Sequence, residues 1–258
     1  MCELLGMTAN VPTDICFSFT GLIQRSGITD QHRDGWGITF YEGKGTRTFK
    51  DTNPGVQSEV AKLVQSYPIK SCLVISHIRK ANRGKVCLEN THPFERELWG
   101  QNWSFAHNGQ LKGIKQKPLH HFQPIGSSDS EHAFCWLLDQ IKEHYPHHIP
   151  ANKLFFSFLQ TKLDELSQMG VFNTLFADGK FLYAYCSKQL YWITRKAPFG
   201  KASLADKEVT IDFKRIAGPT DVVTVISTKP LTADEQWKKM EHCKLYVFHK
   251  GMRKQAGL

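Results

Sequence analysis

The order of extended and helical segments is the feature that most constrains the fold of this chain. Runs rich in apolar and β-branched residues predict strands at 3–9, 36–42, 46–50, 72–77 and 103–107. Further strands are predicted on both sides of Asp178-Gly179, which is a hairpin signal, and at 190–194, 222–227 and 244–248. Two long helical segments lie between these groups. We therefore predict an α+β protein whose helices pack outside antiparallel sheets.

The helices are predicted from capping residues and from apolar periodicity. Ser128-Asp129-Ser130-Glu131 forms a capping box, and apolar side chains at 134, 137, 138 and 141 follow on one face. A second long helix is predicted over 152–169. Shorter helices are predicted over 58–65 and after a Thr13 cap, with apolar residues at 15, 16, 19, 22 and 23.

Length and composition bound the class of protein. A chain of 258 residues forms one large domain or two small ones, and the lack of repeats and linkers favours one. Its apolar share of 41% is typical of a soluble globular protein. No apolar run approaches the ~20 residues of a transmembrane helix. The start, Met-Cys-Glu, has neither a basic nor an apolar segment, so we expect no signal peptide.

Cysteine usage and charge exclude several further classes. The seven cysteines are scattered and include no C-x-x-C pair, so we expect reduced thiols in a cytoplasmic protein and no metal site. The net charge is +9, but the basic residues are dispersed. Their densest run, 112–117, is typical of a solvated loop, and no basic stripe is interleaved with aromatic residues. We therefore expect neither a nucleic acid nor a membrane as a partner.

The second residue, Cys2, carries a thiol, and it also carries a free α-amine if the initiator methionine is removed. An N-terminal amine has a pKa near ~8, so a useful fraction is unprotonated at neutral pH. Such an amine can act as the base that activates a neighbouring thiol. The structural alternative is a buried cysteine beside a strand, which is ordinary in proteins.

Four polar clusters follow predicted strands or begin a helix, where a rigid scaffold positions binding groups. They are Ser-His-Ile-Arg at 76–79, Asn-Thr-His-Pro-Phe at 90–94, Ala-His-Asn-Gly at 106–109 and Ser-Ser-Asp-Ser-Glu at 127–131. Taken singly, each has a structural explanation. Arg79 is then a surface charge, His92 a loop residue, Asn108-Gly109 a turn, and Asp129 a carboxylate favoured by the helix dipole.

Taken in order after Cys2, these clusters resemble the motifs of the class-II glutamine amidotransferases. Asp34-Gly35-Trp36-Gly37 is similar to the D-G-x-G of that family. The resemblance implies an N-terminal-nucleophile hydrolase with a four-layer αββα sandwich. It covers residues 2–250 as a single glutamine amidotransferase type-2 domain, followed by a tail at 251–258 without a structural signal. The chain looks most like the small stand-alone bacterial members.

The resemblance implies a role for each matching residue. Cys2 is the nucleophile, and Asn108 and Gly109 form the oxyanion hole. Arg79 binds the α-carboxylate of glutamine and Asp129 its α-ammonium, while His77 and His92 shape the pocket. The products are ammonia and, through a thioester, glutamate. No cofactor is implied, and any ammonia-accepting partner enzyme is unknown.

The sequence departs from the synthase-linked members at one motif position, and two alternative functions stay open. Those members have H-x-R followed by W/Y-A/S-T, and Asn82 stands here where they have the threonine. The first rival is a γ-glutamyl amidohydrolase acting on glutathione-like amides, because Cys2, Arg79 and Asp129 read only the γ-glutamyl part. The second is a non-catalytic binding or regulatory subunit that keeps Met1.

Overall fold

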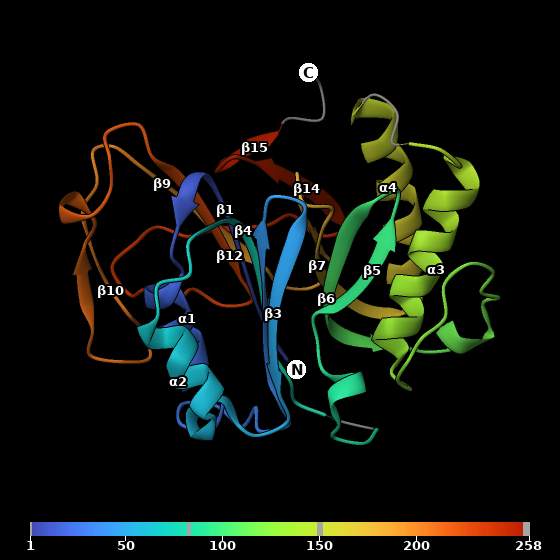
Figure 1. The fold of residues 1–258 in the computed structure, drawn as a ribbon, viewed down its shortest axis with the longest axis horizontal. Coiled ribbons are helices and arrows are strands. Elements are labelled where there is room, and N and C mark those ends of the chain that lie inside the picture. Colours follow the sequence, from blue (N-terminus) through green and yellow to red (C-terminus); the bar gives the residue numbers. More distant parts are fainter. Residues whose placement is uncertain (1, 82–83, 149–151, 255–258) are drawn as a thin grey trace.

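The computed structural model describes residues 2–81, 84–148 and 152–254, and within them two large antiparallel sheets lie face to face (Figure 1). The first is a seven-stranded sheet with the strand order β13-β9-β12-β1-β4-β2-β3. Its strands are β1 (Glu3–Thr13), β2 (Trp36–Glu42), β3 (Gly45–Asp51), β4 (Ser71–Ile78), β9 (Tyr191–Lys196), β12 (Val222–Ser227) and β13 (Lys238–Lys239).

The second is a six-stranded sheet with the order β15-β14-β8-β7-β6-β5. Its strands are β5 (Phe94–Leu98), β6 (Gln101–Leu111), β7 (Gly170–Ala177), β8 (Leu182–Cys186), β14 (Lys244–His249) and β15 (Met252–Lys254). A small separate hairpin joins β10 (Lys201–Ser203) to β11 (Thr210–Asp212). The helices are α1 (Cys16–Gln24), α2 (Glu59–Ser66), α3 (Asp129–His144) and α4 (Asn152–Ser167).

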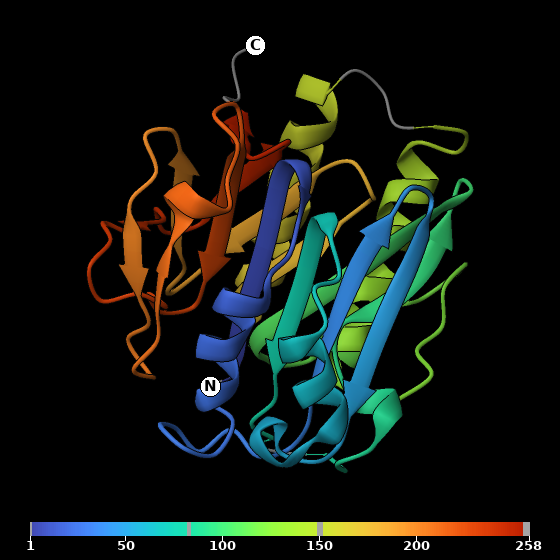
Figure 2. The same cartoon turned by 60° about the vertical axis from the view of Figure 1, so that its left-hand side comes forward.

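Three apolar cores separate the four layers. The middle core lies between the sheets, where Leu4 and Ile75 of one sheet pack with Ala106 and Leu175 of the other. The second core joins α1 and α2 to the outer face of the seven-stranded sheet (Figure 2). The third joins α3 and α4 to the outer face of the six-stranded sheet. This arrangement confirms the predicted αββα sandwich.

Side chains alternate between the two faces of each strand, and this alternation decides which residues reach the space between the sheets. On β1, Leu4 faces the middle core, whereas Leu5 faces the helices. His77 of β4 pairs with Leu4 across the strands, so it also faces the middle layer. On β6, Ala106 faces the middle layer and Phe105 faces α3 and α4, so Asn108 points the same way as Ala106.

The structure differs from the sequence prediction at several elements. Thr13 does not cap a helix, because β1 continues to Thr13 and pairs there with Ser71. The helix begins at Cys16 instead, and the Cys16 N–H donates to Oδ1 of Asp14 at 3.2 Å. Strands β5, β10, β11, β13 and β15 were not predicted. The last of them lies in the C-terminal segment where the sequence carries no structural signal, and it pairs with β14.

Among the described residues, none of the helices combines the length and the apolar character that crossing a membrane requires.

Candidate active site

Cys2 lies just ahead of β1, at the end of the sandwich where β4 finishes. The pairing of Glu3 with Ile78 brings Cys2 next to the chain that follows β4. There the Lys80 N–H donates to the Cys2 sulfur at 3.3 Å, and the thiol lies 3.6 Å from the Lys80 carbonyl oxygen. Burial raises the pKa of the Cys2 thiol above its ordinary value. A thiol in this setting is protonated at neutral pH, so it needs a base to become a nucleophile.

Arg79 directly follows β4, and two hydrogen bonds of its backbone hold it in place. Its N–H donates to the Gly35 carbonyl at 2.8 Å, and its carbonyl accepts from the Asp34 N–H at 3.2 Å. The side chain is only 6% exposed, and Nη1 donates to the Lys85 carbonyl at 3.1 Å. Within the described parts of the chain, no carboxylate pairs with this guanidinium. A buried guanidinium without a counter-ion favours the binding of an anion.

Asp129 opens α3 and connects this helix to the end of β6. Its Oδ2 accepts from the Leu111 N–H at 2.8 Å, and its Oδ1 accepts from the Ser130 N–H at 2.9 Å. Ser128 caps the helix as predicted, since its hydroxyl accepts from the Glu131 N–H at 3.1 Å. No cation from residues 2–81, 84–148 or 152–254 pairs with Asp129. Its carboxylate is therefore available to a cationic ligand.

Asn108 and Gly109 lie in β6, which runs beside β7. The Asn108 side chain is fully buried, and both its amide nitrogen and its amide oxygen lack a hydrogen-bond partner among the described residues. Two unpartnered polar atoms in a buried side chain are costly, which points to a partner supplied by a ligand or by water. At Gly109 a Cβ would lie 1.7 Å from the Val171 carbonyl oxygen and 2.6 Å from Nε2 of His107. Glycine is therefore required at 109 by the protein's own packing.

Three buried histidines surround this region. The rings of His77 and His92 are tilted by 36° with their centroids 4.2 Å apart, and the ring centroids of His92 and Phe94 are 4.3 Å apart. Burial lowers the pKa of His77 to about 3 and holds the pKa of His92 well below its ordinary value. His107 is anchored separately, with Nδ1 2.8 Å from the Ser130 hydroxyl and Nε2 3.1 Å from the Val171 carbonyl. Burial lowers the pKa of His107 as well, so all three rings are neutral at neutral pH.

A cavity of about 350 Å³ brings five of the seven predicted site residues together, a volume typical of small-ligand sites. Those five are Cys2, Arg79, His92, Gly109 and Asp129. His77 and Asn108 are not among the residues that line it, although Asn108 lies in β6 between His107 and Gly109, which both line it. Asn82, the departure noted in the sequence, lies outside the described residues.

The cavity also includes residues to which the sequence analysis gave no role. Lys80 is one of them, and Asn90, Ser127 and Ser130 lie inside the quoted motifs. Lys115 belongs to the basic run that was predicted to be a solvated loop. Its Nζ donates to the Ser127 carbonyl at 2.7 Å, which brings the side chain to the rim of the cavity. The usable signal was membership of a quoted motif, which Asn90, Ser127 and Ser130 share with His107 and Ser128.

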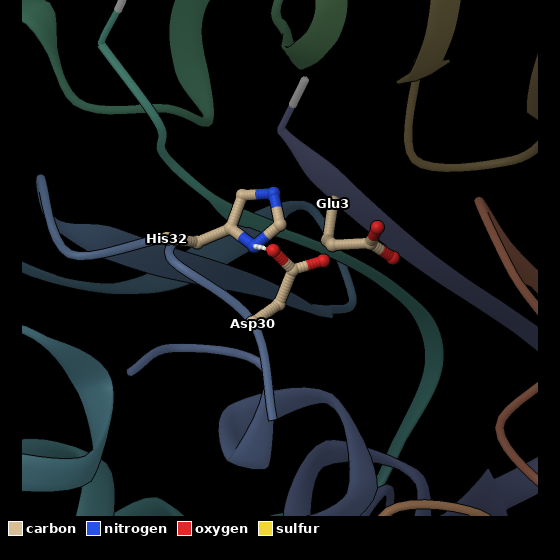
Figure 3. Close-up of side chains that lie close together, drawn as sticks. All are labelled: Glu3, Asp30 and His32. Atoms are coloured by element: carbon tan, nitrogen blue, oxygen red, sulfur yellow. Dashed lines mark ion pairs between the residues drawn. The ribbon is translucent and has the colours of Figure 1, made fainter. Parts of the chain in front are cut away.

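Glu3, Asp30 and His32 form a separate acidic group on the outer face of β1 (Figure 3). Their potential ligand atoms all lie within 4.8 Å of one another. However, Glu3 pairs with Arg25 at 3.0 Å, and Lys229 lies 3.1 Å from Asp30 and 3.6 Å from Glu3. These cations already neutralise the carboxylates, so the arrangement is an ion-pair network that anchors the start of β1.

Comparison with known proteins agrees with the motif order. The family model "Glutamine amidotransferases class-II" matches residues 1–257. The Escherichia coli (strain K12) protein named "Putative glutamine amidotransferase YafJ" is 62% identical over 241 residues, covering 93% of this chain and 94% of that protein. A 2.0 Å crystal structure of a predicted glutamine amidotransferase from Pseudomonas aeruginosa is 47% identical with a TM-score of 0.78, covering 98% and 99% of the two chains. The phosphoribosylpyrophosphate amidotransferase of B. subtilis is 16% identical with a TM-score of 0.60. The match covers 98% of this chain and 48% of that chain, and it shows that the two share the fold.

Proposed function

The chain belongs to the class-II glutamine amidotransferases, and from this membership we propose that it hydrolyses the γ-amide of glutamine through a thioester on Cys2. One observation carries the proposal: a single cavity holds Cys2, a buried guanidinium without a counter-ion and a carboxylate without a cation among the described residues. Such a pair of opposite charges complements an amino-acid zwitterion. The nucleophile then lies in the same cavity as the far end of the bound side chain.

Recognition in this proposal uses both charges of the substrate. Arg79 binds the α-carboxylate with the guanidinium donors that Lys85 leaves unused. Asp129 binds the α-ammonium with carboxylate oxygens that already accept two backbone N–H groups and are thereby held in place. Neutral His92 forms part of the wall, so it adds no competing charge.

The chemical steps follow from the properties of Cys2. Removal of Met1 frees the Cys2 amine, which takes the proton of the thiol while the sulfur attacks the amide carbon. The resulting oxyanion is stabilised by the Asn108 side-chain N–H and the Gly109 backbone N–H. The protonated amine then gives its proton to the departing nitrogen, which leaves as ammonia. Water then gives one proton to the amine and adds to the thioester carbon. The carbon–sulfur bond breaks, the amine passes that proton to the sulfur, and glutamate leaves with the remaining proton of water released from its new carboxyl group. Thiol, amine and amide donors supply the whole reaction, so the proposal includes no metal or cofactor.

The proposal also covers the cellular location of the protein and the fate of the ammonia. All seven cysteines are free thiols, which fits a reducing compartment, so we propose that the protein is cytoplasmic. The ammonia is released to an acceptor that the chemistry of this site does not identify.

The proposal is tested with protein whose N-terminus is verified as Cys2 by intact mass. Incubation with glutamine should release glutamate and ammonia in equal amounts. Parallel assays with γ-glutamyl peptides compare release of the substituted amine and address the first rival function. Retention of Met1 in the purified protein, with no turnover of either substrate class, would favour the binding or regulatory alternative.

Replacement of Asn108 by alanine tests the oxyanion hole. We expect kcat to fall by roughly 10²–10³-fold, the usual loss for one such donor, with little change in KM. Steady-state kinetics with glutamine give both constants. A raised KM with a normal kcat would instead make Asn108 an ordinary pocket residue.

Replacement of the two charged residues tests the zwitterion recognition. Arg79→Lys keeps the positive charge but loses the planar fork, and Asp129→Asn leaves the substrate ammonium without a counter-ion. Both variants should raise KM by about 10-fold or more, with smaller effects on kcat, because each removes binding common to ground state and transition state. Unchanged KM values in both variants would contradict the proposed recognition.

A further inference from the structure

Two loops border the cavity, and one buried side chain joins them. Segment 84–91 follows Arg79, and segment 125–128 precedes Asp129. Asn90, which is 2% exposed, lies between them. Its Oδ1 accepts from the Ser127 N–H at 2.8 Å, and its Nδ2 lies 3.3 Å from the Ser127 hydroxyl and 3.2 Å from the Lys85 carbonyl. Both ends of the amide are therefore used in holding the two loops together.

The two loops also approach each other closely at Gly126. A Cβ at this position would lie 2.5 Å from Oδ1 of Asn90 and 2.5 Å from the Glu89 carbonyl oxygen. Real Cβ atoms do not approach other atoms so closely, so any larger residue at 126 must push the loops apart. The contact around Asn90 is thus a tightly packed junction in addition to a set of hydrogen bonds.

This junction connects the supports of the two charged groups. The Lys85 carbonyl accepts from both Nη1 of Arg79 at 3.1 Å and Nδ2 of Asn90 at 3.2 Å. At the other end, Ser127 lies two residues before Asp129, and Lys115 holds its carbonyl at 2.7 Å. A shift of one loop against the other therefore changes the separation between the guanidinium of Arg79 and the carboxylate of Asp129.

We propose that Asn90 is a positioning residue that sets the separation of Arg79 and Asp129, and so sets the selectivity for a substrate that carries both an α-carboxylate and an α-ammonium. The inference rests on the proposed function, because it concerns the same cavity. Two-point recognition depends on geometry, since a misplacement of about 1 Å in a positioning group costs up to about 10²-fold in rate. Asn90 makes no proposed contact with the reacting atoms.

The experiment compares Asn90→Ala with Asn10→Ala. Asn10 is a matched control because its amide also joins two segments, donating to the Thr220 carbonyl at 2.8 Å and accepting from the Val222 N–H at 2.8 Å, away from the cavity.

The substrates are glutamine, glutaramate, which lacks the α-ammonium, and 4-aminobutanamide, which lacks the α-carboxylate. For Asn90→Ala we expect KM for glutamine to rise by about 10-fold, kcat to change by less than about 3-fold, and the preference for glutamine over both analogues to shrink by about 10-fold. Asn10→Ala should keep the parent values.

A second variant guards against a simple loss of folding. Gly126→Ala leaves all the hydrogen-bonding groups in place but separates the loops, and it should shift KM and selectivity in the same direction. Thermal melting checks each variant, and alkylation of Cys2 by iodoacetamide, which carries no zwitterion, should proceed at the parent rate. Unchanged selectivity in folded Asn90→Ala and Gly126→Ala proteins would overturn this inference. Lack of turnover in the parent protein would instead refute the proposed function on which it rests.

Discussion

Replacement of Cys2 by alanine should lower glutamine turnover by about 10³-fold or more while the protein stays folded. The thiol is the group that forms the thioester in the proposed reaction, and no other described side chain lining the cavity is a thiol. In the described structure its sulfur contacts only the Lys80 backbone through hydrogen bonds, at 3.3 and 3.6 Å. Removal of these weak contacts should leave the melting temperature close to that of the parent.

The control is Cys72→Ala, since Cys72 is an exposed thiol on the same sheet, in β4. This variant should keep full activity. A diazo-ketone analogue of glutamine should add covalently to Cys2 in the parent protein, as read by peptide mapping. An adduct on Cys72 or Cys135, or full activity in Cys2→Ala, would show that the nucleophile has been assigned wrongly.

The sequence predicted those elements whose apolar pattern is strong within the element itself. The strands at 36–42 and 222–227 have the predicted bounds, and each contains a run of consecutive buried residues. The helix that starts after Ser128 also begins where its cap predicts. Strand β5 was missed because charged side chains occupy its centre, at Glu95, Arg96 and Glu97. It is an edge strand, and pairing with β6 rather than its own pattern holds it in the sheet.

Thr13 shows how tertiary pairing overrides a local signal. A threonine before an apolar periodic run is a normal helix start, but here the chain is still paired with Ser71 at that residue. Strand β15 is similar, since residues 252–254 have no strand pattern and become extended only against β14. Contacts between residues far apart in the sequence decided both cases, and a local reading has no access to them.

The candidate site also combines residues that local motifs predicted with contacts that only the fold creates. Of the seven residues that the motif order selected, the fold brings Cys2, Arg79, His92, Gly109 and Asp129 to one cavity, whereas His77 and Asn108 do not line it. The reason for glycine at 109 could not be predicted from the sequence. The Val171 carbonyl oxygen occupies the space that a Cβ would need, and Val171 is brought there by the pairing of β7 with β6. The contacts of Asn90 with Ser127 span 37 residues, so no pattern in the sequence predicts them.

A blocked N-terminus should abolish activity as completely as loss of the thiol. An N-terminal extension that cannot be removed converts the Cys2 amine to an amide, which has no basic lone pair at neutral pH. Burial already raises the pKa of the thiol, so without the amine the sulfur has no base within its own residue. The extension also adds chain beside the cavity that Cys2 lines. We therefore expect folded but inactive protein, with the same far-ultraviolet circular dichroism as the parent.

The matched control protein carries the same extension at the C-terminus, where Met252–Lys254 pairs with β14 and does not line the cavity. That protein should be fully active. Protease trimming of the N-terminal extension back to Cys2 should restore activity to the blocked protein, because it frees the amine without changing any side chain. The activity of both fusion proteins is measured as ammonia release, and intact mass verifies each N-terminus. Full glutaminase activity in a verified, untrimmed N-terminal fusion would refute the role of the amine as base, since the thiol would then act with its amine converted to an amide.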